Sequence, residues 1–291
     1  ISDNETKILI NNMKFINPKL VFNEVEVNIN NSIFKGIYDA ETKSTAIKFK
    51  GGKKSIISKT TFETINCRAI YSEVYSRNWG WGDDDKVRSL VIDFCNFENC
   101  GNKYLMGGAL CNTYNDFTIS NSKFISCIAK LGGALRLGRL QNDCILNCYF
   151  EKCFSLHFQN PENPQSWNKG WLPENKNDSL RTYYTNGGAI YSNDSSKSDG
   201  GCPIKNSKFV ASNIYLGDRI VSDYHIRNCK FIDSLLTYER YSSSYHADDN
   251  DTTYEKGEDK LESTSWCLCK PLELDWIENY EGDTGFDARN V

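Results

Sequence analysis

The sequence lacks a surplus of positive charge, a long apolar segment and a recognisable set of catalytic residues. Its 34 Lys and Arg against 38 Asp and Glu give a formal net charge of -4, so we expect no nucleic-acid partner. No apolar run approaches the ~18 residues of a membrane-spanning helix, so we expect no direct membrane insertion. The three histidines, His157, His225 and His246, form no Ser/His/Asp or Cys/His set with the spacing of a catalytic site.

What the sequence does contain is an internal repeat in which Phe follows Ile after five positions. The eight pairs are Ile10/Phe15, Ile29/Phe34, Ile57/Phe62, Ile92/Phe97, Ile119/Phe124, Ile145/Phe150, Ile204/Phe209 and Ile226/Phe231. An offset held through eight occurrences indicates one recurring structural element. Two positions after the Ile there is usually Asn, with Lys59 and Phe94 as departures. Asn tolerates the left-handed conformation, which predicts a bend between two short strands.

A glycine corner completes the repeat unit. Gly-Gly-Ala followed by Leu or Ile occurs at 107–110, 132–135 and 187–190, and paired glycines permit a sharp turn with close approach of a neighbouring coil. The unit is strand, Asn bend, strand, glycine corner and strand, in 27 residues between Phe97 and Phe124. We predict a parallel β-helix of about eight coils, right-handed as parallel crossovers are by default, because only stacking can bury Ile on Ile and Phe on Phe.

The predicted domain organisation is a parallel β-helix over residues 1–236 and an acidic linker with a C-terminal cap over 237–291. The polar stretch from Asp248 to Asp259 is typical of a linker. The apolar residues after Trp266 are expected to cover the last rung, with docking of a partner as the alternative. Since the chain opens on Ile1 and its first Ile/Phe pair comes within ten residues, we expect a mature or excised piece of a longer protein.

Two features of this sequence resemble known surface proteins. The Gly-Gly-Ala-[Ile/Leu] corners and Phe-x-x-polar strand ends resemble, over about residues 90–212, the repeats of the polymorphic outer-membrane protein family of adhesins. This chain has Cys or Ser where that family has Asn. Its richness in Asn, Lys, Ser and Tyr also resembles the scaffoldins of anaerobic gut fungi. These resemblances imply a non-catalytic, extracellular or cell-surface binding role, such as a cohesin-like module.

The chain has 12 cysteines, more than is usual in a cytosolic protein and fewer than in a small disulfide scaffold. Cys100, Cys127 and Cys153 occupy one position on three consecutive rungs, about 4.8 Å apart, which a disulfide can span. A ladder of buried free thiols is the alternative. Cys267 and Cys269 lack zinc-site spacing and are candidates for tail disulfides.

The chain also has five potential N-glycosylation sites, which agree with secretion. They are Asn4, Asn30, Asn177, Asn193 and Asn250.

Three insertions interrupt the repeat, at 76–86, about 159–185 and about 194–201, and solenoid insertions often form the binding face. A Trp in such a loop either seals a flank of the coils or acts as a contact anchor. The candidate partner-binding residues are Trp79, Trp81, Asp83, Asp84, Asp85, Trp167, Trp171, Tyr183 and Tyr184.

Parallel β-helices include pectin lyases and polygalacturonases, so catalysis is an alternative function for this fold class. Such chemistry needs convergent carboxylates, or an acidic calcium site with an Arg or Lys base. The dense acidic run Asp83 to Asp85 lies in an insertion, where a solvated turn is expected and calcium binding is the alternative. No histidine stands in the Gly-His-Gly strand of a polygalacturonase. We therefore expect no enzyme, metal or cofactor.

The predicted function is a non-catalytic module of a larger adhesin or scaffold that binds another protein, a surface receptor or docking module, through its loops and one sheet face. The first alternative is a β-helix that binds or cleaves carbohydrate, with the loop tryptophans stacked on a glycan. The second is a structural spacer.

Overall fold

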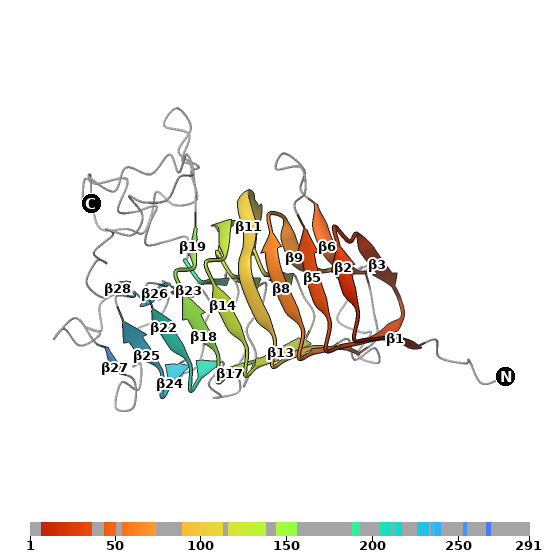
Figure 1. Cartoon of the computed structure of the whole chain (residues 1–291). Coiled ribbons are helices and arrows are strands. Elements are labelled where there is room, and N and C mark those ends of the chain that lie inside the picture. The colour runs from red at the N-terminus through yellow and green to blue at the C-terminus, as the bar shows by residue number, and fades with distance from the viewer. Residues whose placement is uncertain are drawn as a thin grey trace, which may run out of the picture.

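The chain folds into a stack of short β-strands arranged in three sheets (Figure 1). The computed structural model describes residues 7–36, 44–50, 54–73, 89–112, 116–137, 144–155, 188–192, 204–210, 214–216, 226–232 and 236–239, with Ser212, Ser234, 253–254 and 266–268. All of the described regular structure is strand, and the strands run parallel from coil to coil up to the last pair. This confirms the predicted parallel β-helix.

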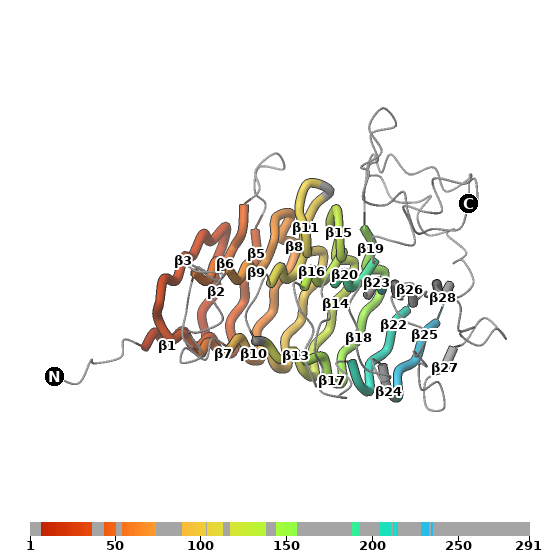
Figure 2. The backbone as a smooth tube through the Cα atoms, turned by 180° about the vertical axis from the view of Figure 1, so that it is seen from behind, coloured from red at the N-terminus to blue at the C-terminus, as the bar shows by residue number. Residues whose placement is uncertain are grey.

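Each coil contributes one strand to each sheet. The first sheet contains β1 (Lys7–Asn11), β4 (Glu26–Asn30), β7 (Ser55–Ser58), β10 (Ser89–Asp93), β13 (Asp116–Ser120), β17 (Ile145–Leu146), β21 (Ile204–Lys205) and β24 (Ile226–Arg227). The second contains β2 (Lys14–Ile16), β5 (Ile33–Gly36), β8 (Thr61–Ile65), β11 (Asn96–Met106), β14 (Lys123–Ile125), β18 (Tyr149–Glu151), β22 (Lys208–Val210), β25 (Lys230–Ile232) and β27 (Thr253–Tyr254). The third contains β3 (Leu20–Asn23), β6 (Thr45–Lys50), β9 (Arg68–Glu73), β12 (Leu110–Asn112), β16 (Leu135–Leu137), β20 (Ile190–Ser192), β23 (Ile214–Leu216), β26 (Leu236–Glu239) and β28 (Trp266–Leu268). From behind, the first sheet forms one side of the stack (Figure 2).

The register places like residues on like residues. All eight repeat isoleucines align along the first sheet, and all eight phenylalanines align along the second. Consecutive Phe rings stack with centroids 4.7 to 4.9 Å apart. From Phe34 to Phe231 each ring is at most 1% exposed. Each ring thus buries both of its faces, and the predicted ladders are confirmed.

The bend after each isoleucine is left-handed in every coil, as the repeated Asn predicts. The bend residues all have φ between 47° and 56°: Asn12, Asn31, Lys59, Phe94, Asn121, Asn147, Asn206 and Asn228. Stacked Asn side chains hydrogen-bond to one another across the coils, for example Asn31 Nδ2 to Asn12 Oδ1 at 2.6 Å. Lys59 and Phe94 adopt the same conformation without an Asn side chain, because the stacked neighbours impose it.

The residue after the bend points into the core and satisfies the backbone of the corner. These residues are Ser32, Thr60, Cys95, Ser122, Cys148, Ser207 and Cys229, all buried. From Ser32 to Ser207 their side chains donate to the carbonyl oxygen two positions earlier, as Ser122 Oγ does to Ser120 at 2.7 Å, while Cys229 Sγ donates to the carbonyl oxygen of Ile204. The hydroxyl oxygen also accepts a backbone N–H from the preceding coil, as Ser122 does from Cys95 at 3.0 Å. The polar groups buried at the corner are therefore hydrogen-bonded, and these bonds offset the cost of removing the groups from water.

The glycine corner is a site of close backbone approach between coils. A Cβ atom on Gly108 would lie 2.5 Å from the carbonyl oxygens of Cys100 and Gly133. Gly107 and Gly132 have φ of 68° and 60°. Only glycine fits this corner without displacing backbone, and the sheets continue in register past it.

Two local additions extend the regular stack. β11 is longer than its neighbours and pairs with β15 (Ile128–Leu131), which pairs with β19 (Phe154–Ser155), so a ridge rises beside the second sheet (Figure 1). At the other end of the chain, β27 pairs with β25 and β28 pairs antiparallel with β26. These two short strands end the second and third sheets, while the wider prediction of a linker and cap over 237–291 stays a prediction. Among the described residues, no helix is long and apolar enough to cross a membrane.

Candidate protein-binding face

The loop residues predicted to bind a partner lie outside the described residues, and their roles stay predictions. This group comprises Trp79, Trp81, Asp83, Asp84, Asp85, Trp167, Trp171, Tyr183 and Tyr184. Their positions in the sequence nevertheless point to one sheet. Residues 74–88 follow directly after β9, residues 156–187 run from the end of β19 to three positions before the start of β20, and residues 193–200 follow directly after β20. Because β9 and β20 both belong to the third sheet, the outer face of that sheet is the candidate binding surface.

On the outer face of the third sheet, one row of side chains is formed by the residue that follows the inward-facing Ile or Leu of each strand. The aligned residues, in order along the stack, are Val21, Lys48, Tyr71, Cys111, Arg136 and Tyr191. Residues alternate between the two faces of a strand, and from Ile47 onward the residue before each member, such as Ile70 before Tyr71, is in the core. We call these six residues the outer row. Within the row itself, Cys111 and Tyr191 are only 4% and 8% exposed.

Contacts between neighbouring coils hold the side chains around Tyr71 in place. Lys48 Nζ lies 2.8 Å from Glu73 Oε2 and 4.9 Å from the centroid of the Tyr71 ring. Arg68 Cζ lies 4.7 Å from the same ring centroid, and Arg68 Nε donates a hydrogen bond of 2.9 Å to the carbonyl oxygen of Met106. Burial is the main reason that the pKa of Tyr71 is raised, so this phenol stays protonated and can donate a hydrogen bond.

Cys111 lies in the outer row between Tyr71 and Arg136. It is 4% exposed, and burial raises the pKa of its thiol while the charges of Arg68 and Arg136 oppose that rise. The thiol of Cys111 therefore stays protonated and neutral. The Nε atom of Arg136 is buried and finds no hydrogen-bond acceptor among the described residues.

The charge on this face is unbalanced. Strands β3 to β23 of the third sheet carry four basic residues, Lys48, Lys50, Arg68 and Arg136, and one acidic residue, Glu73. Glu73 is already paired with Lys48. Tyr and Arg are the residue types enriched in protein-binding hot spots, because they combine large contact area with directional hydrogen bonding. The face is thus chemically suited to a partner that supplies negative charge.

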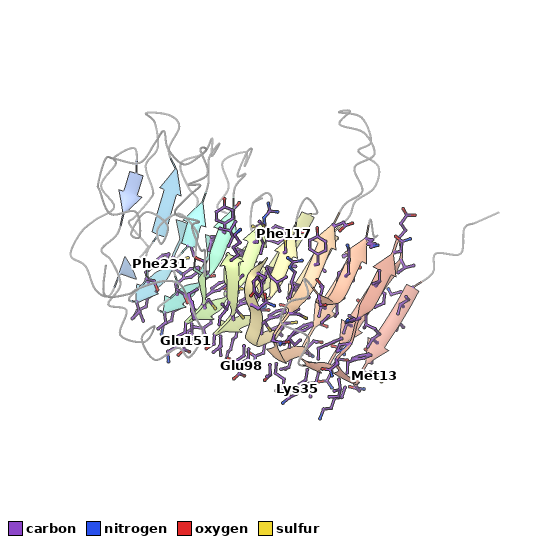
Figure 3. All side chains as sticks on the ribbon, turned by 90° about the horizontal axis from the view of Figure 1, so that it is seen from above. Met13, Lys35, Glu98, Phe117, Glu151 and Phe231 are labelled. Atoms are coloured by element: carbon purple, nitrogen blue, oxygen red, sulfur yellow. The ribbon has the colours of Figure 1, made fainter. Side chains whose placement is uncertain are left out.

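The outer face of the second sheet differs because its charges are balanced locally and solvated. Lys35 and Glu63 pair at 3.4 Å with 48% and 37% of their side-chain surface exposed, and Lys208 lies 5.7 Å from the Tyr149 ring centroid. Lys35, Glu98 and Glu151 project along one long side of the stack (Figure 3). Exposed pairs of this kind contribute about 0–1 kcal/mol, and such a face is typical of ordinary solvent-exposed surface.

The outer row is not among the binding residues predicted from the sequence. A signal was present, since Lys48, Tyr71, Cys111, Arg136 and Tyr191 each follow Ala-Ile or Ala-Leu. This signal lies in the position of the residues and not in their type, because the residue type changes from coil to coil. Only the register of the third sheet shows that these different residues are neighbours.

Of the two alternatives for the cysteine ladder, the structure has free thiols. Cys100, Cys127 and Cys153 are buried and form no disulfide, and the same holds for the other described cysteines with described side chains. Each of the three donates a weak hydrogen bond to the carbonyl oxygen two residues earlier, at 3.5 to 3.7 Å. Burial raises the pKa of Cys127 and Cys153 well above the usual thiol range. Cys269 and the side chain of Cys267 lie outside the description.

Asn30 is the one potential glycosylation site within the described residues. Its Oδ1 accepts a hydrogen bond of 3.0 Å from Ser58 Oγ, and Ser32, the third residue of its sequence motif, is 1% exposed. Asn4, Asn177, Asn193 and Asn250 lie outside the described ranges.

Two further searches bear on the chemistry of the protein. Within the part of the chain that the structure describes, no group of three or more His, Cys, Asp or Glu residues could hold a metal ion. Comparison of the chain with protein-family models, with curated proteins and with solved structures found no match.

Proposed function

We propose that the protein is a non-catalytic extracellular module that binds another protein through the outer face of its third sheet and the adjoining loops. In this proposal the protein is one module of a larger adhesin or scaffold. Like a cohesin, it would bind a surface receptor or a docking module. The observation that carries the proposal is the set of contacts at Tyr71, where the cations of Lys48 and Arg68 lie 4.9 and 4.7 Å from the ring centroid.

The rigidity of the stack supports a role in binding. The outer row is fixed by strand pairing on both sides, and Arg68 is held by Met106 and Tyr71. A side chain that is already ordered before binding loses little conformational entropy when a partner arrives. A preorganised face with Tyr and Arg at its centre is therefore suited to form the hot spot of an interface.

The buried cysteines are compatible with an extracellular location. Burial raises the pKa of Cys95 and Cys148 to about 12. The reactive species in oxidation is the thiolate, so thiols kept protonated and inside the core resist oxidation outside the cell.

A glycan partner is the alternative function. Aromatic rings of a binding face can stack on sugar rings, and Tyr71 and Tyr191 lie on this one. The cations of Lys48 and Arg68 already lie against the Tyr71 ring, at 4.9 and 4.7 Å from its centroid. Since these cations occupy ring surface that a sugar would need, the observed contacts favour a protein partner.

Photocrosslinking tests the proposed function directly. The photoreactive amino acid p-benzoylphenylalanine would replace Tyr71 in one variant and Tyr149, on the outer face of the second sheet, in a matched control. Both variants would be irradiated with the secreted and surface proteins of the source organism, and adducts would be identified by mass spectrometry. We expect one protein adduct from position 71, displaced by excess unlabelled chain, and none from position 149. Equal labelling from both positions, or selective binding to a glycan array without an adduct, would contradict the proposal.

A further inference from the structure

The first coil leaves one edge of each sheet open at the N-terminal end of the stack. We propose that these edges pair with the same edges of a second copy of the chain, which gives a head-to-head dimer. Its two-fold axis runs through the middle of β1, where Leu9 lies opposite Leu9 of the second copy. The inference goes beyond the proposed function, because pairing along the edges leaves the outer face of the third sheet uncovered.

The two ends of the stack differ in whether their edges are covered. Strands β1, β2 and β3 are edge strands of their sheets, and no described strand pairs with their free sides (Figure 1). At the other end, β27 pairs with β25 and β28 pairs antiparallel with β26. Head-to-tail stacking of two copies would need the covered end. Head-to-head pairing uses only the open end, and it closes as a dimer with no edge left at the interface.

The free backbone groups of the first coil belong to residues whose side chains point outward. The backbone N–H of Asn12 donates to the carbonyl oxygen of Asn30 at 3.2 Å, which is toward the second coil. Successive residues of a strand direct their backbone groups to opposite sides within the sheet. The N–H and C=O groups of Lys7, Leu9 and Asn11 therefore point away from the second coil, and the side chains of these three residues are exposed.

Exposed apolar side chains lie on all three open strands. Leu9 on β1 and Ile16 on β2 are each 61% exposed, and Val21 on β3 is 57% exposed. On the inner side, Ile10 and Phe15 are only partly buried, whereas their counterparts in the second coil are at most 1% exposed. Open edges of natural sheets are usually protected by charge, proline or a covering segment. An edge with an exposed apolar residue on every strand is instead suited to pairing with another strand.

Two requirements set the register of the self-pairing along β1. Residues opposite each other in an antiparallel pair have their side chains on the same face, and hydrogen-bonded pairs form where both residues direct backbone groups across the interface. The register that uses all five residues of β1 sets Leu9 against Leu9 and Lys7 against Asn11 of the second copy. Both pairs are then hydrogen-bonded. Lys7 does not meet its own counterpart, and its charge is already paired with Glu26.

The charges of the first coil favour an axis through β1 over an axis through β2. With the axis through β1, β2 of one copy meets β3 of the other, and β3 (Leu20–Asn23) has no charged residue. Lys14 of β2 then lies beside an uncharged strand. An axis through β2 would bring both Lys14 side chains onto one pair of three-residue strands. Like charges close together across a strand pair are destabilising.

Sedimentation velocity of the full chain over a series of concentrations tests the dimer. Leu9→Lys sets like charges opposite each other, with about 5.5 Å between their Cα atoms, so we expect the dissociation constant to rise at least tenfold. The matched control is Ile125→Lys, which makes the same change at an outward, partly exposed position in the middle of the stack. We expect the control to change the dissociation constant less than twofold. Circular dichroism establishes that each variant is folded.

Mixing two charge variants tests the position of the axis. Leu9→Lys and Leu9→Glu should each associate weakly alone, and an equimolar mixture should recover the wild-type affinity because opposite charges then meet across the axis. Loss of association through unfolding would not be recovered in this way. Failure of the folded mixture to associate would show that Leu9 does not lie on the axis.

Three further results would overturn the inference. A wild-type chain that stays monomeric over the whole concentration series would show that the open edges do not pair. Oligomers that continue to grow with concentration would show open association in place of a closed dimer. An equal loss of affinity in Ile125→Lys would show that the first coil is not the interface.

Discussion

Replacing Phe124 with Ala tests the aromatic ladder where it is most continuous. Phe124 is fully buried and stacks on Phe97 at 4.9 Å and on Phe150 at 4.8 Å. Removing a buried Phe side chain costs roughly 3–5 kcal/mol, and each aromatic pair adds about 0.5–1.5 kcal/mol. Because the strands on both sides fix the coil spacing, the cavity cannot collapse easily. We expect the free energy of unfolding to fall by about 5 kcal/mol, measured by urea denaturation.

The neighbouring residue Ile125 provides the control. It is on the same strand but points outward and is partly exposed, so Ile125→Ala should cost about 1 kcal/mol or less. The terminal ring Phe15 has a single stacked neighbour, Phe34, and Phe15→Ala should cost about half as much as Phe124→Ala. If Phe124→Ala were no more destabilising than Ile125→Ala, the ladder would not be the main source of stability.

Three further predictions follow from the corners and thiols. Phe94, which is 58% exposed with φ of 51°, should stabilise the fold by about 1 kcal/mol when changed to Asn, and a loss in the same urea assay would contradict this. Gly108→Ala should cost about 3 kcal/mol through overlap with backbone oxygens at 2.5 Å; an unchanged urea midpoint would refute the close approach. Burial raises the pKa of Cys148 from 9.0 to about 12, so the unfolded thiol ionises first and the free energy of unfolding should fall as pH rises from about 9 toward 12. Cys148→Ser should flatten that slope, and an identical slope would contradict the explanation.

The core could be predicted from the sequence because a solenoid repeats one local rule. Each coil contacts only its neighbours, so a constant offset between Ile and Phe is sufficient to specify the ladders. The first bend was equally predictable, including Lys59 and Phe94, because their coils are aligned with coils that have Asn there. The second left-handed position, two residues after the Phe, carries unlike residues such as Ser126 and Lys152. No shared residue type indicates it in the sequence.

The candidate binding face could not be predicted in the same way. Outer-row residues such as Tyr71, Cys111 and Arg136 do not need to match their neighbours in order to bury one another, so no repeated letter reveals them. They become a cluster only when the coils are stacked in register. The cysteine ladder shows a related limit, because the rung spacing fits both a disulfide and two packed thiols. The tryptophan loops have no position in the repeat, and their placement does not follow from it.

Disulfide capture by the native Cys111 is the most direct test of the stacked register that forms the outer row. Tyr71 is one coil away from Cys111 in the outer row, and Lys48 is two coils away. Rungs are about 4.8 Å apart, so one rung fits a disulfide and two do not. After refolding in a glutathione buffer, mass spectrometry should find Tyr71→Cys bridged to Cys111 and Lys48→Cys unbridged. A bridge from position 48, or none from position 71, would contradict the stacking on which the fold and the binding face depend.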